Sequence, residues 1–283
     1  GKRLADLFQG RPRLTVAALL AAPLGWLVIG YLGSLGVMLV ASFWHLNELS
    51  GEVTQGFSLD NYDVLFTDEV YRTIAMRTIG IAAAVTVTDV ILAFPIAFYM
   101  AKVAKPRMQS LLVVAVLLPL WSSYLVKVGA WRLMLSEDGV INWALEPFGL
   151  HGPGYGTAAV WLVMSYMWLP YMIIPIYAGL ERIPDSILSA SEDLGAKPWR
   201  TFRKVILPMS FPAVVAGSIF TFSLTLGDYI TPANVGTKQF IGNVVYSNFV
   251  SNLPLAAAIT TIPIVVMVIY LLIARKLGAF DHV

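Results

Sequence analysis

Two acidic residues in apolar surroundings are the first candidates for chemistry in this sequence. Asp89 is the one charged residue within the segment 78–101, and Asp228 directly follows the uncharged segment 205–227. A carboxyl group inside a long apolar segment is costly to bury, and it usually faces a polar interior or a water-filled cavity. Each carboxylate could be the counter-charge for a cationic ligand. The other reading is structural: a hydrogen-bond partner for nearby threonines at Asp89, and the cap of a broken helix at Asp228.

Other reactive combinations are missing from the sequence. The three histidines (His45, His151 and His282) stand far apart and there is no cysteine, so no metal-ligand spacing is present. No Gly-x4-Gly-Lys-Ser/Thr loop occurs, which excludes a P-loop nucleotide site in this chain. We therefore predict no catalytic residue, no metal site, no cofactor and no enzyme activity. The basic residues flank apolar segments instead of forming a patch, which argues against nucleic-acid binding.

The elements that carry these residues are predicted to be membrane-spanning helices. The 283 residues are 58% hydrophobic and 13% charged, with a mean hydropathy of +0.73. Six apolar segments can each supply the roughly 20 residues that a helix needs to cross a bilayer; they lie near 17–42, 75–100, 109–128, 157–180, 209–229 and 254–274. The sequence thus predicts an all-α membrane protein with six transmembrane helices in a single domain, 1–283.

Basic residues predict the orientation. Fourteen of the 19 lysines and arginines flank alternate ends of the segments, and five flank the other ends. Because cytoplasmic flanks are rich in basic residues, both termini are expected inside. The segment 1–16 and the loops 101–108 and 181–208 are then cytoplasmic, next to membrane lipid, and the loop 43–74 faces outward.

The cytoplasmic loop 181–208 has the pattern of two short helices. Asp185 suits a first helical turn, Gly195 suits the residue that ends a helix, and Pro198 suits the start of the next. We expect Leu207-Pro208 to end this second helix. Its apolar and basic side chains, Trp199, Phe202 and Arg200 among them, either anchor the loop to anionic lipid or form a docking surface for another protein.

The same loop resembles the EAA loop of permeases in binding-protein-dependent ABC importers. That motif has Glu-Ala-Ala, three residues, Gly, nine residues, Ile, one residue and Leu-Pro; this chain has Ser189-Ala-Ser191, Gly195 and Val205-Ile-Leu-Pro208 at the same spacing. Serines replace the family glutamate and one alanine. The resemblance implies a type I ABC importer permease (MetI-like) fold and a loop that docks on an ATPase subunit. The residues it places at that contact are Ser189, Ala190, Glu192, Asp193, Gly195, Trp199, Arg200 and Phe202.

Other stretches are similar to polyamine (spermidine/putrescine) permeases. They are 119–131, which begins Pro-Leu-Trp-Ser-Ser-Tyr, then 170–177, 227–232 and 241–244. This resemblance implies a bacterial inner membrane location and uptake of polyamines delivered by an extracytoplasmic binding protein. It also implies a second, different permease chain and two copies of an ATPase subunit that binds ATP and Mg. The candidate substrate path comprises Asp89, Trp121, Tyr124, Asp228 and Tyr229.

Two alternatives remain open at this point. The first is an ABC permease for another small organic solute, such as an opine, an amino-acid derivative, thiamine or a metal chelate. The second is a membrane transporter outside the ABC class.

Overall fold

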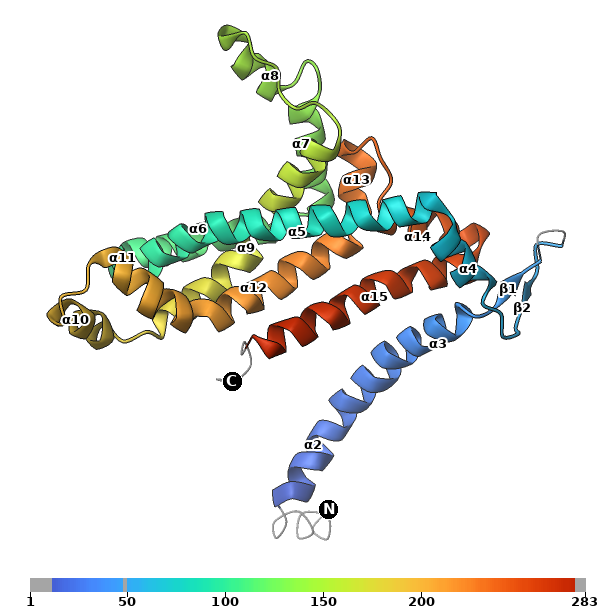
Figure 1. Ribbon diagram of the computed structural model, residues 1–283, viewed down its shortest axis with the longest axis horizontal. Helices are drawn as coiled ribbons and strands as arrows, with labels where there is room; N and C mark the ends of the chain where they lie inside the picture. The colour runs from blue at the N-terminus through green and yellow to red at the C-terminus, as the bar shows by residue number, and fades with distance from the viewer. Residues whose placement is uncertain (1–11, 48–49, 278–283) are drawn as a thin grey trace. The chain divides into compact units, whose positions relative to one another are not determined.

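The computed structural model is almost entirely helical and describes residues 12–47 and 50–277 (Figure 1). His282 and the first eleven residues of the predicted segment 1–16 lie outside this range.

The chain divides into two compact units. One comprises residues 1–65 and 248–258, and the other comprises residues 66–247 and 259–283.

The first unit begins with a helix and continues into a small hairpin. Its elements are α2 (Pro12–Trp26), the π-helical η1 (Leu27–Leu32), α3 (Gly33–Ala41), β1 (His45–Leu46), β2 (Val53–Thr54) and the first part of α4 (Asp60–Thr67). The two strands are antiparallel, with His45 opposite Thr54. Asn61 donates hydrogen bonds to the carbonyls of Ser42 and Trp44, at 3.0 and 2.8 Å. These two bonds fasten α4 to the end of α3.

The second unit contains the remaining long helices. In chain order its elements are α5 (Glu69–Phe98), η2 (Tyr99–Val103), α6 (Pro106–Trp121), α7 (Tyr124–Leu135), α8 (Val140–Leu145), η3 (Glu146–Phe148), α9 (Thr157–Glu181), α10 (Asp185–Asp193), α11 (Pro198–Thr201), η4 (Phe202–Ile206), α12 (Leu207–Gly227), α13 (Ile230–Val235), α14 (Ile241–Ser251) and α15 (Leu253–Lys276). The last two helices cross the boundary between the units.

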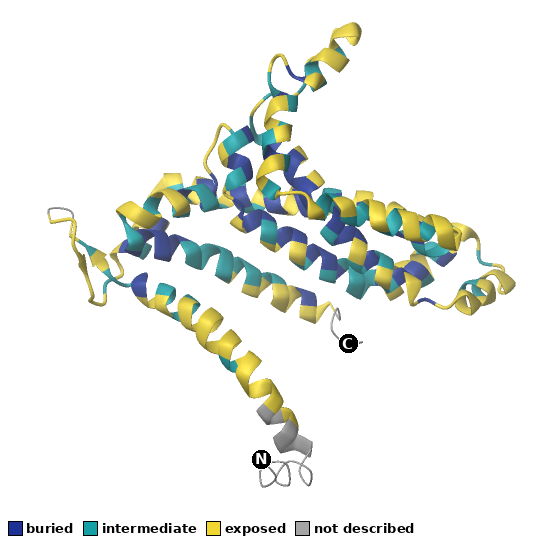
Figure 2. Ribbon diagram, turned by 180° about the vertical axis from the view of Figure 1, so that it is seen from behind, coloured by how far each residue is buried: buried dark blue, intermediate teal, exposed yellow. Residues whose placement is uncertain are grey.

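Three of these helices, α5, α9 and α12, form the core of the second unit. The apolar part of α9 is 61% buried, the largest share among the candidate spans, so α9 is the central helix. Buried residues follow α9 and the sides of α5 and α12 that face it (Figure 2). Small residues allow the close approach of α9 and α12: a Cβ on Gly179 would collide with Ala213, and one on Gly217 would lie 2.8 Å from the sulfur of Met172.

The predicted count of six spans holds only if one bent pair is counted as a span. Among the described residues, five helices are long and apolar enough to cross a membrane, and α6 with α7 makes a sixth. The continuous third span predicted at 109–128 is wrong, because the chain turns by 90° between Trp121 and Tyr124. Ser122 is extended there, and its hydroxyl donates to the Pro119 carbonyl at 2.9 Å. Serine side chains compete in this way for backbone groups and favour a break.

The predicted end of the second loop helix at Leu207-Pro208 is also wrong. Helical structure runs from Pro198 to Gly227, through α11, η4 and α12. Proline 208 lacks an N–H and would interrupt a regular α-helix. The π-helical turns of η4, Phe202–Ile206, lie just before it and carry the helix past this position.

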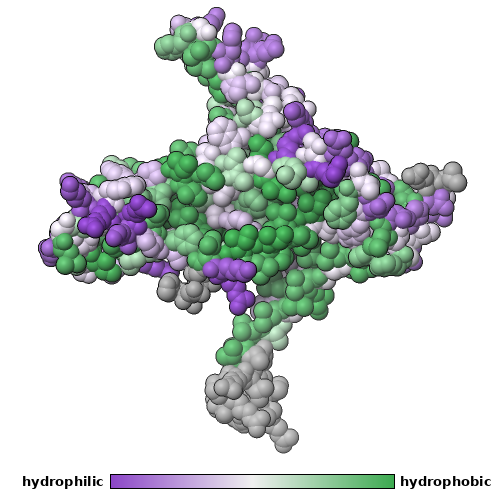
Figure 3. Space-filling model, viewed as in Figure 1, coloured by the Kyte–Doolittle hydropathy of each residue, from purple (hydrophilic) through white to green (hydrophobic). Residues whose placement is uncertain are grey.

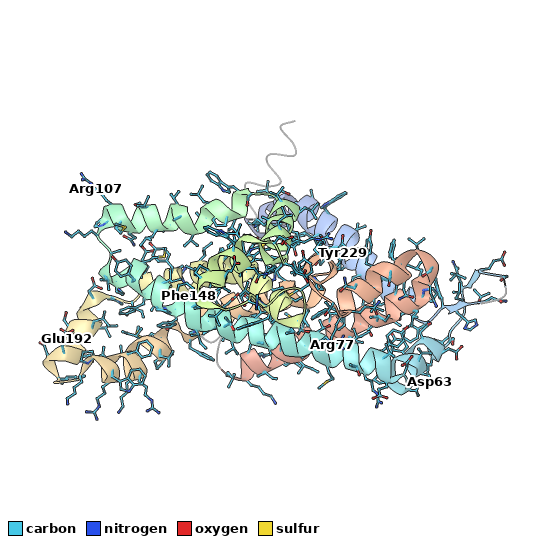
Figure 4. All side chains as sticks on the ribbon, turned by 90° about the horizontal axis from the view of Figure 1, so that it is seen from above. Asp63, Arg77, Arg107, Phe148, Glu192 and Tyr229 are labelled. Carbon is cyan, nitrogen blue, oxygen red and sulfur yellow. The ribbon has the colours of Figure 1, made fainter. Side chains whose placement is uncertain are left out.

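The predicted cytoplasmic loops of this unit lie at one end of the three-helix core. Hydrophilic side chains gather around α10 and α11, whereas hydrophobic ones cover the middle of the helices (Figure 3). Arg107 and Glu192, from the two loops, lie at this same end (Figure 4). This placement agrees with the prediction that both loops lie on the same, cytoplasmic side of the membrane.

Candidate functional site

Gly195 ends α10 and turns the chain toward α11. Its φ of +74° lies in the left-handed region, which glycine adopts without a steric penalty. Its N–H donates to the carbonyl of Glu192 at 2.8 Å, and the N–H of Ala196 donates to Ser191 at 3.0 Å. These two bonds are the Schellman pattern that closes a helix C-terminus. The predicted helix end at Gly195 is therefore present as a defined turn.

Side chains across this turn fix the angle between α10 and α11. The hydroxyls of Ser191 and Thr201 hydrogen-bond at 2.9 Å. Ser191 is one of the two positions where this chain departs from the EAA motif, and its hydroxyl makes a contact that alanine could not make. Ser189, the other departure, bonds only to the Asp185 carbonyl of its own helix, at 3.2 Å.

Contacts between aromatic rings connect the exposed loop to the core. Trp199 is 69% exposed and stacks on Phe202, with ring centroids 5.4 Å apart and planes at 20°. Phe202 in turn contacts buried Phe94 of α5 edge-on, at 5.4 Å. Two ring contacts thus connect Trp199 to α5.

A largely apolar groove of about 680 Å³ lies beside these rings. Its lining comes from the end of α5, from α10, from the turn after it and from the start of the helix that begins at Pro198. The residues are Phe98, Leu188, Glu192, Ala196, Pro198, Trp199, Thr201, Phe202 and Ile206. The structure brings three of the predicted contact residues, Glu192, Trp199 and Phe202, to this groove. The other five, Ser189, Ala190, Asp193, Gly195 and Arg200, are exposed around it. Sequence reasoning did not single out Phe98, which reaches the groove from a helix about a hundred positions earlier.

A second set of residues meets at the far end of α12. The carboxylate of Asp228 accepts hydrogen bonds from the N–H groups of Ile230 and Thr231 at 2.9 and 3.1 Å, and so caps α13. Its other oxygen accepts from the hydroxyl of Tyr124, at 2.5 Å. Tyr124 also pairs with the Thr231 hydroxyl at 2.8 Å. The structure thus shows the capping geometry that the sequence had left open.

Aromatic rings extend this cluster in two directions. Tyr124 stacks on Trp168 with centroids 5.8 Å apart, and Tyr229 stacks on Tyr246 at 4.7 Å. A Cβ on Gly242 would lie 2.9 Å from the Asp228 carbonyl, so the start of α14 presses closely against this turn. The predicted residues Tyr124, Asp228 and Tyr229 are therefore neighbours in space.

The other two predicted path residues lie elsewhere. Trp121 is 82% exposed at the end of α6, before the bend. Asp89 is 0% exposed and lies in the core of α5, α9 and α12. Thr231 joins the site although the sequence had not singled it out. Among the described residues, no three histidine, aspartate or glutamate side chains are grouped to hold a metal ion.

Comparison with known proteins identifies the family of this chain. The model of the family described as binding-protein-dependent transport system inner membrane component matches residues 75–279. The chain belongs to this family. The matched range contains the α10–α11 loop and the Tyr124–Asp228 cluster, and the family consists of membrane components of transporters.

Relatives of this inner membrane component are known from bacteria. It is 44% identical to the inner membrane ABC transporter permease protein YdcU of Escherichia coli K12, over 99% of this chain and 95% of the relative. It is 27% identical to the spermidine/putrescine transport system permease protein PotB of the same organism, over 88% and 92%. These similarities identify an ABC importer permease with several apolar helices.

Solved structures show the same fold. A bacterial ABC transporter involved in the import of the acidic polysaccharide alginate contains a chain with a TM-score of 0.66 and 18% identity, covering 97% of this chain and 98% of that one. The complex of an alginate ABC transporter with a pentasaccharide-bound periplasmic protein gives 0.69 and 18%, over 96% of each. The predicted type I importer permease fold is confirmed.

Proposed function

We propose that this permease takes up polyamines across the bacterial inner membrane, driven by ATP that a separate subunit hydrolyses. The observation that carries the coupling part is the solvent-exposed α10–α11 surface, which has a defined turn at Gly195 and is linked by rings to α5. An exposed tryptophan beside an apolar groove is typical of a protein docking site.

The partner on this surface is an ABC ATPase subunit, in two copies, which carries the ATP and Mg. A second permease, a different chain, completes the pathway, and an extracytoplasmic binding protein delivers the substrate. Rocking of the two permeases, driven through the α10–α11 loop, then exposes the pathway alternately to each side.

The polyamine assignment is supported by similarity to PotB and by the Tyr124–Asp228–Tyr229 cluster. Aromatic faces attract ammonium groups, and the alkyl chain of a polyamine packs on the same faces. In this proposal Tyr124 and Tyr229 form an aromatic wall and Asp228 attracts the cationic ends. Trp121 belongs to the wall in the outer part of the path, and Asp89 becomes reachable only when the three-helix core opens.

A different small organic solute is the second candidate. Both oxygens of Asp228 already accept hydrogen bonds, and Asp89 is sealed from solvent. A path in which one carboxylate is held by structural hydrogen bonds and the other is sealed from solvent suits a neutral or anionic solute better than a polycation.

Uptake by the complete transporter in proteoliposomes separates these candidates. We expect labelled spermidine or putrescine to accumulate only with ATP and the cognate binding protein. Asp228→Asn should weaken polyamine uptake much more than Tyr124→Phe, because only the first removes a negative charge. Equal effects of the two variants would contradict a counter-charge role for Asp228. A binding protein that copurifies with a neutral or anionic solute would favour the second candidate.

A further inference from the structure

Tyr246 of α14 lies face to face with Tyr229, within the second unit. The ring centroids are 4.7 Å apart and the ring planes are nearly parallel, at 11°. Each ring has two faces, and the stack covers one face of each. Tyr246 is 64% exposed, whereas Tyr229 is 38% exposed. The more accessible ring of the pair is therefore Tyr246, which the sequence had not singled out.

One side of α14 holds this stack against the turn that carries Asp228. Gly242 and Asn243 lie four and three residues before Tyr246, so all three residues share one side of the helix. The Asn243 amide donates to the carbonyl of Tyr229 at 2.7 Å. Gly242 approaches so closely that a Cβ there would lie 2.9 Å from the Asp228 carbonyl. A backbone contact, an amide and a ring together fix Tyr246 beside this turn.

The composition of α14 is not that of a lipid-facing helix. Four of its 11 residues are asparagine or serine, and its length of about 16 Å is too short to cross the hydrocarbon core. Amides and hydroxyls are found in membrane helices mainly where they face other helices or water. Neither α13 nor α14 contains a lysine or an arginine that could lie on the rings. The accessible face of Tyr246 therefore suits a ligand better than an acyl chain.

Asp228 places a negative charge beside the stack. Its two oxygens already accept hydrogen bonds, from Ile230, Thr231 and Tyr124. An ammonium group that approaches the turn is attracted by this charge, but the carboxylate is held by its own donors. The face of a tyrosine ring carries a partial negative charge and attracts a cation without any hydrogen bond. The ring next to the carboxylate can thus make the direct contact.

We propose that Tyr246 is a specificity-determining residue of this permease. Its ring face contacts an ammonium group of the transported polyamine and the methylene groups beside it, and Tyr229 supports the ring from behind. The inference rests on the proposed uptake of polyamines and names a further residue for it. A neutral solute would pack on the same ring through apolar contact alone, so the charge on the ring face separates the two kinds of solute.

Fluorination of the ring tests this contact. Fluorine withdraws electrons from the ring face and weakens its attraction for a cation, but it leaves the shape of the ring almost unchanged. Position 246 is given phenylalanine or ring-fluorinated phenylalanine in the complete transporter, in proteoliposomes with saturating binding protein. We expect spermidine and putrescine uptake to persist in Tyr246→Phe and to fall several-fold when that ring is fluorinated. The Tm and the basal ATPase rate should stay the same.

Phe220 of α12, which is 53% exposed, is the matched control. The same fluorinated residue at position 220 should leave uptake unchanged. Equal uptake with the plain and the fluorinated ring at position 246 would overturn this inference, and polyamine uptake by the wild type would still support the proposed function. A fall in uptake that is accompanied by a lower Tm would also overturn it, because the ring would then act through packing. Absence of polyamine uptake in the wild type would overturn both proposals.

Discussion

Lys102 and Asp185 form an ion pair at 2.9 Å that joins two loops 83 positions apart in the sequence. The same ammonium donates to the carbonyl of Ile183 at 2.6 Å. The lysine side chain is 10% exposed and the aspartate 87%. Lys102 therefore holds the entry to α10 mainly through a sheltered hydrogen bond, and the start of the α10–α11 loop is fixed to the end of η2.

Lys102→Met should loosen this entry. We expect the free energy of unfolding to fall by about 1 kcal/mol, because the Ile183 carbonyl loses its donor. ATP-driven uptake should fall further than ATPase activity. Asp185→Asn should have a smaller effect, since exposed ion pairs contribute little. Uptake and ATPase rates of both variants check the order, and a larger loss in Asp185→Asn would contradict it.

Gly195→Ala should strain the turn between α10 and α11. A non-glycine residue in the left-handed region costs about 1–2 kcal/mol, and no neighbouring atom lies within 4 Å of a Cβ placed there, so the cost is conformational. We expect ATP hydrolysis to continue while uptake falls, and Gly195→Asp to act in the same direction. Gly80→Ala in α5, also in open space but at a helical φ, is the control. Normal uptake in both Gly195 variants would show that the turn at Gly195 is not needed for transport.

Tyr124→Phe should destabilise the turn between α12 and α13. It removes the hydroxyl shared by Asp228 and Thr231, and a hydrogen bond to a charged group contributes about 1.5–3 kcal/mol. Denaturation in detergent or nanodiscs measures the change. Tyr246→Phe keeps the stack on Tyr229 and serves as the comparison. Equal stability of the two variants would show that the Tyr124 hydroxyl is dispensable.

Gly179→Ala should separate α9 from α12. The added methyl group meets Ala213 on the facing helix, and overpacking of this kind costs about 1–3 kcal/mol. Gly129→Ala on α7 adds the same group where nothing lies within 4 Å. A thermal unfolding series should therefore show a lower Tm for the first variant only. A double variant, Gly179→Ala with Ala213→Gly, should recover part of the loss.

The sequence predicted the helices and the α10–α11 turn because both depend on local signals. Apolar length, a glycine at the helix end and a proline at the next start are readable without tertiary structure. The break at Ser122-Ser123 was missed because the apolar run continues through it, and hydropathy does not register a serine hydroxyl bonded to the backbone. The π-helical passage before Pro208 was missed because proline normally predicts a helix boundary.

The candidate path was predicted in part. Tyr124, Asp228 and Tyr229 meet because the residues of one recognisable stretch fold against those of another. Their contacts could not be inferred. Whether Asp228 caps a helix or is a free counter-charge depends on whether Tyr124 reaches it, and the sequence does not show this. The complete burial of Asp89 could not be inferred either, since it depends on how α5 packs against its neighbouring helices.

The uninterrupted helix from Pro198 to Gly227 has a mechanical consequence. Its 30 residues make a rod of about 45 Å. Trp199 stands at one end, and Asp228 follows directly at the other. If the core holds one point of this helix fixed, a sideways movement of the Trp199 end moves the Asp228 end in the opposite direction. Under the proposed coupling, a movement of the ATPase subunit at Trp199 would be carried along this helix to the turn that Tyr124 fastens.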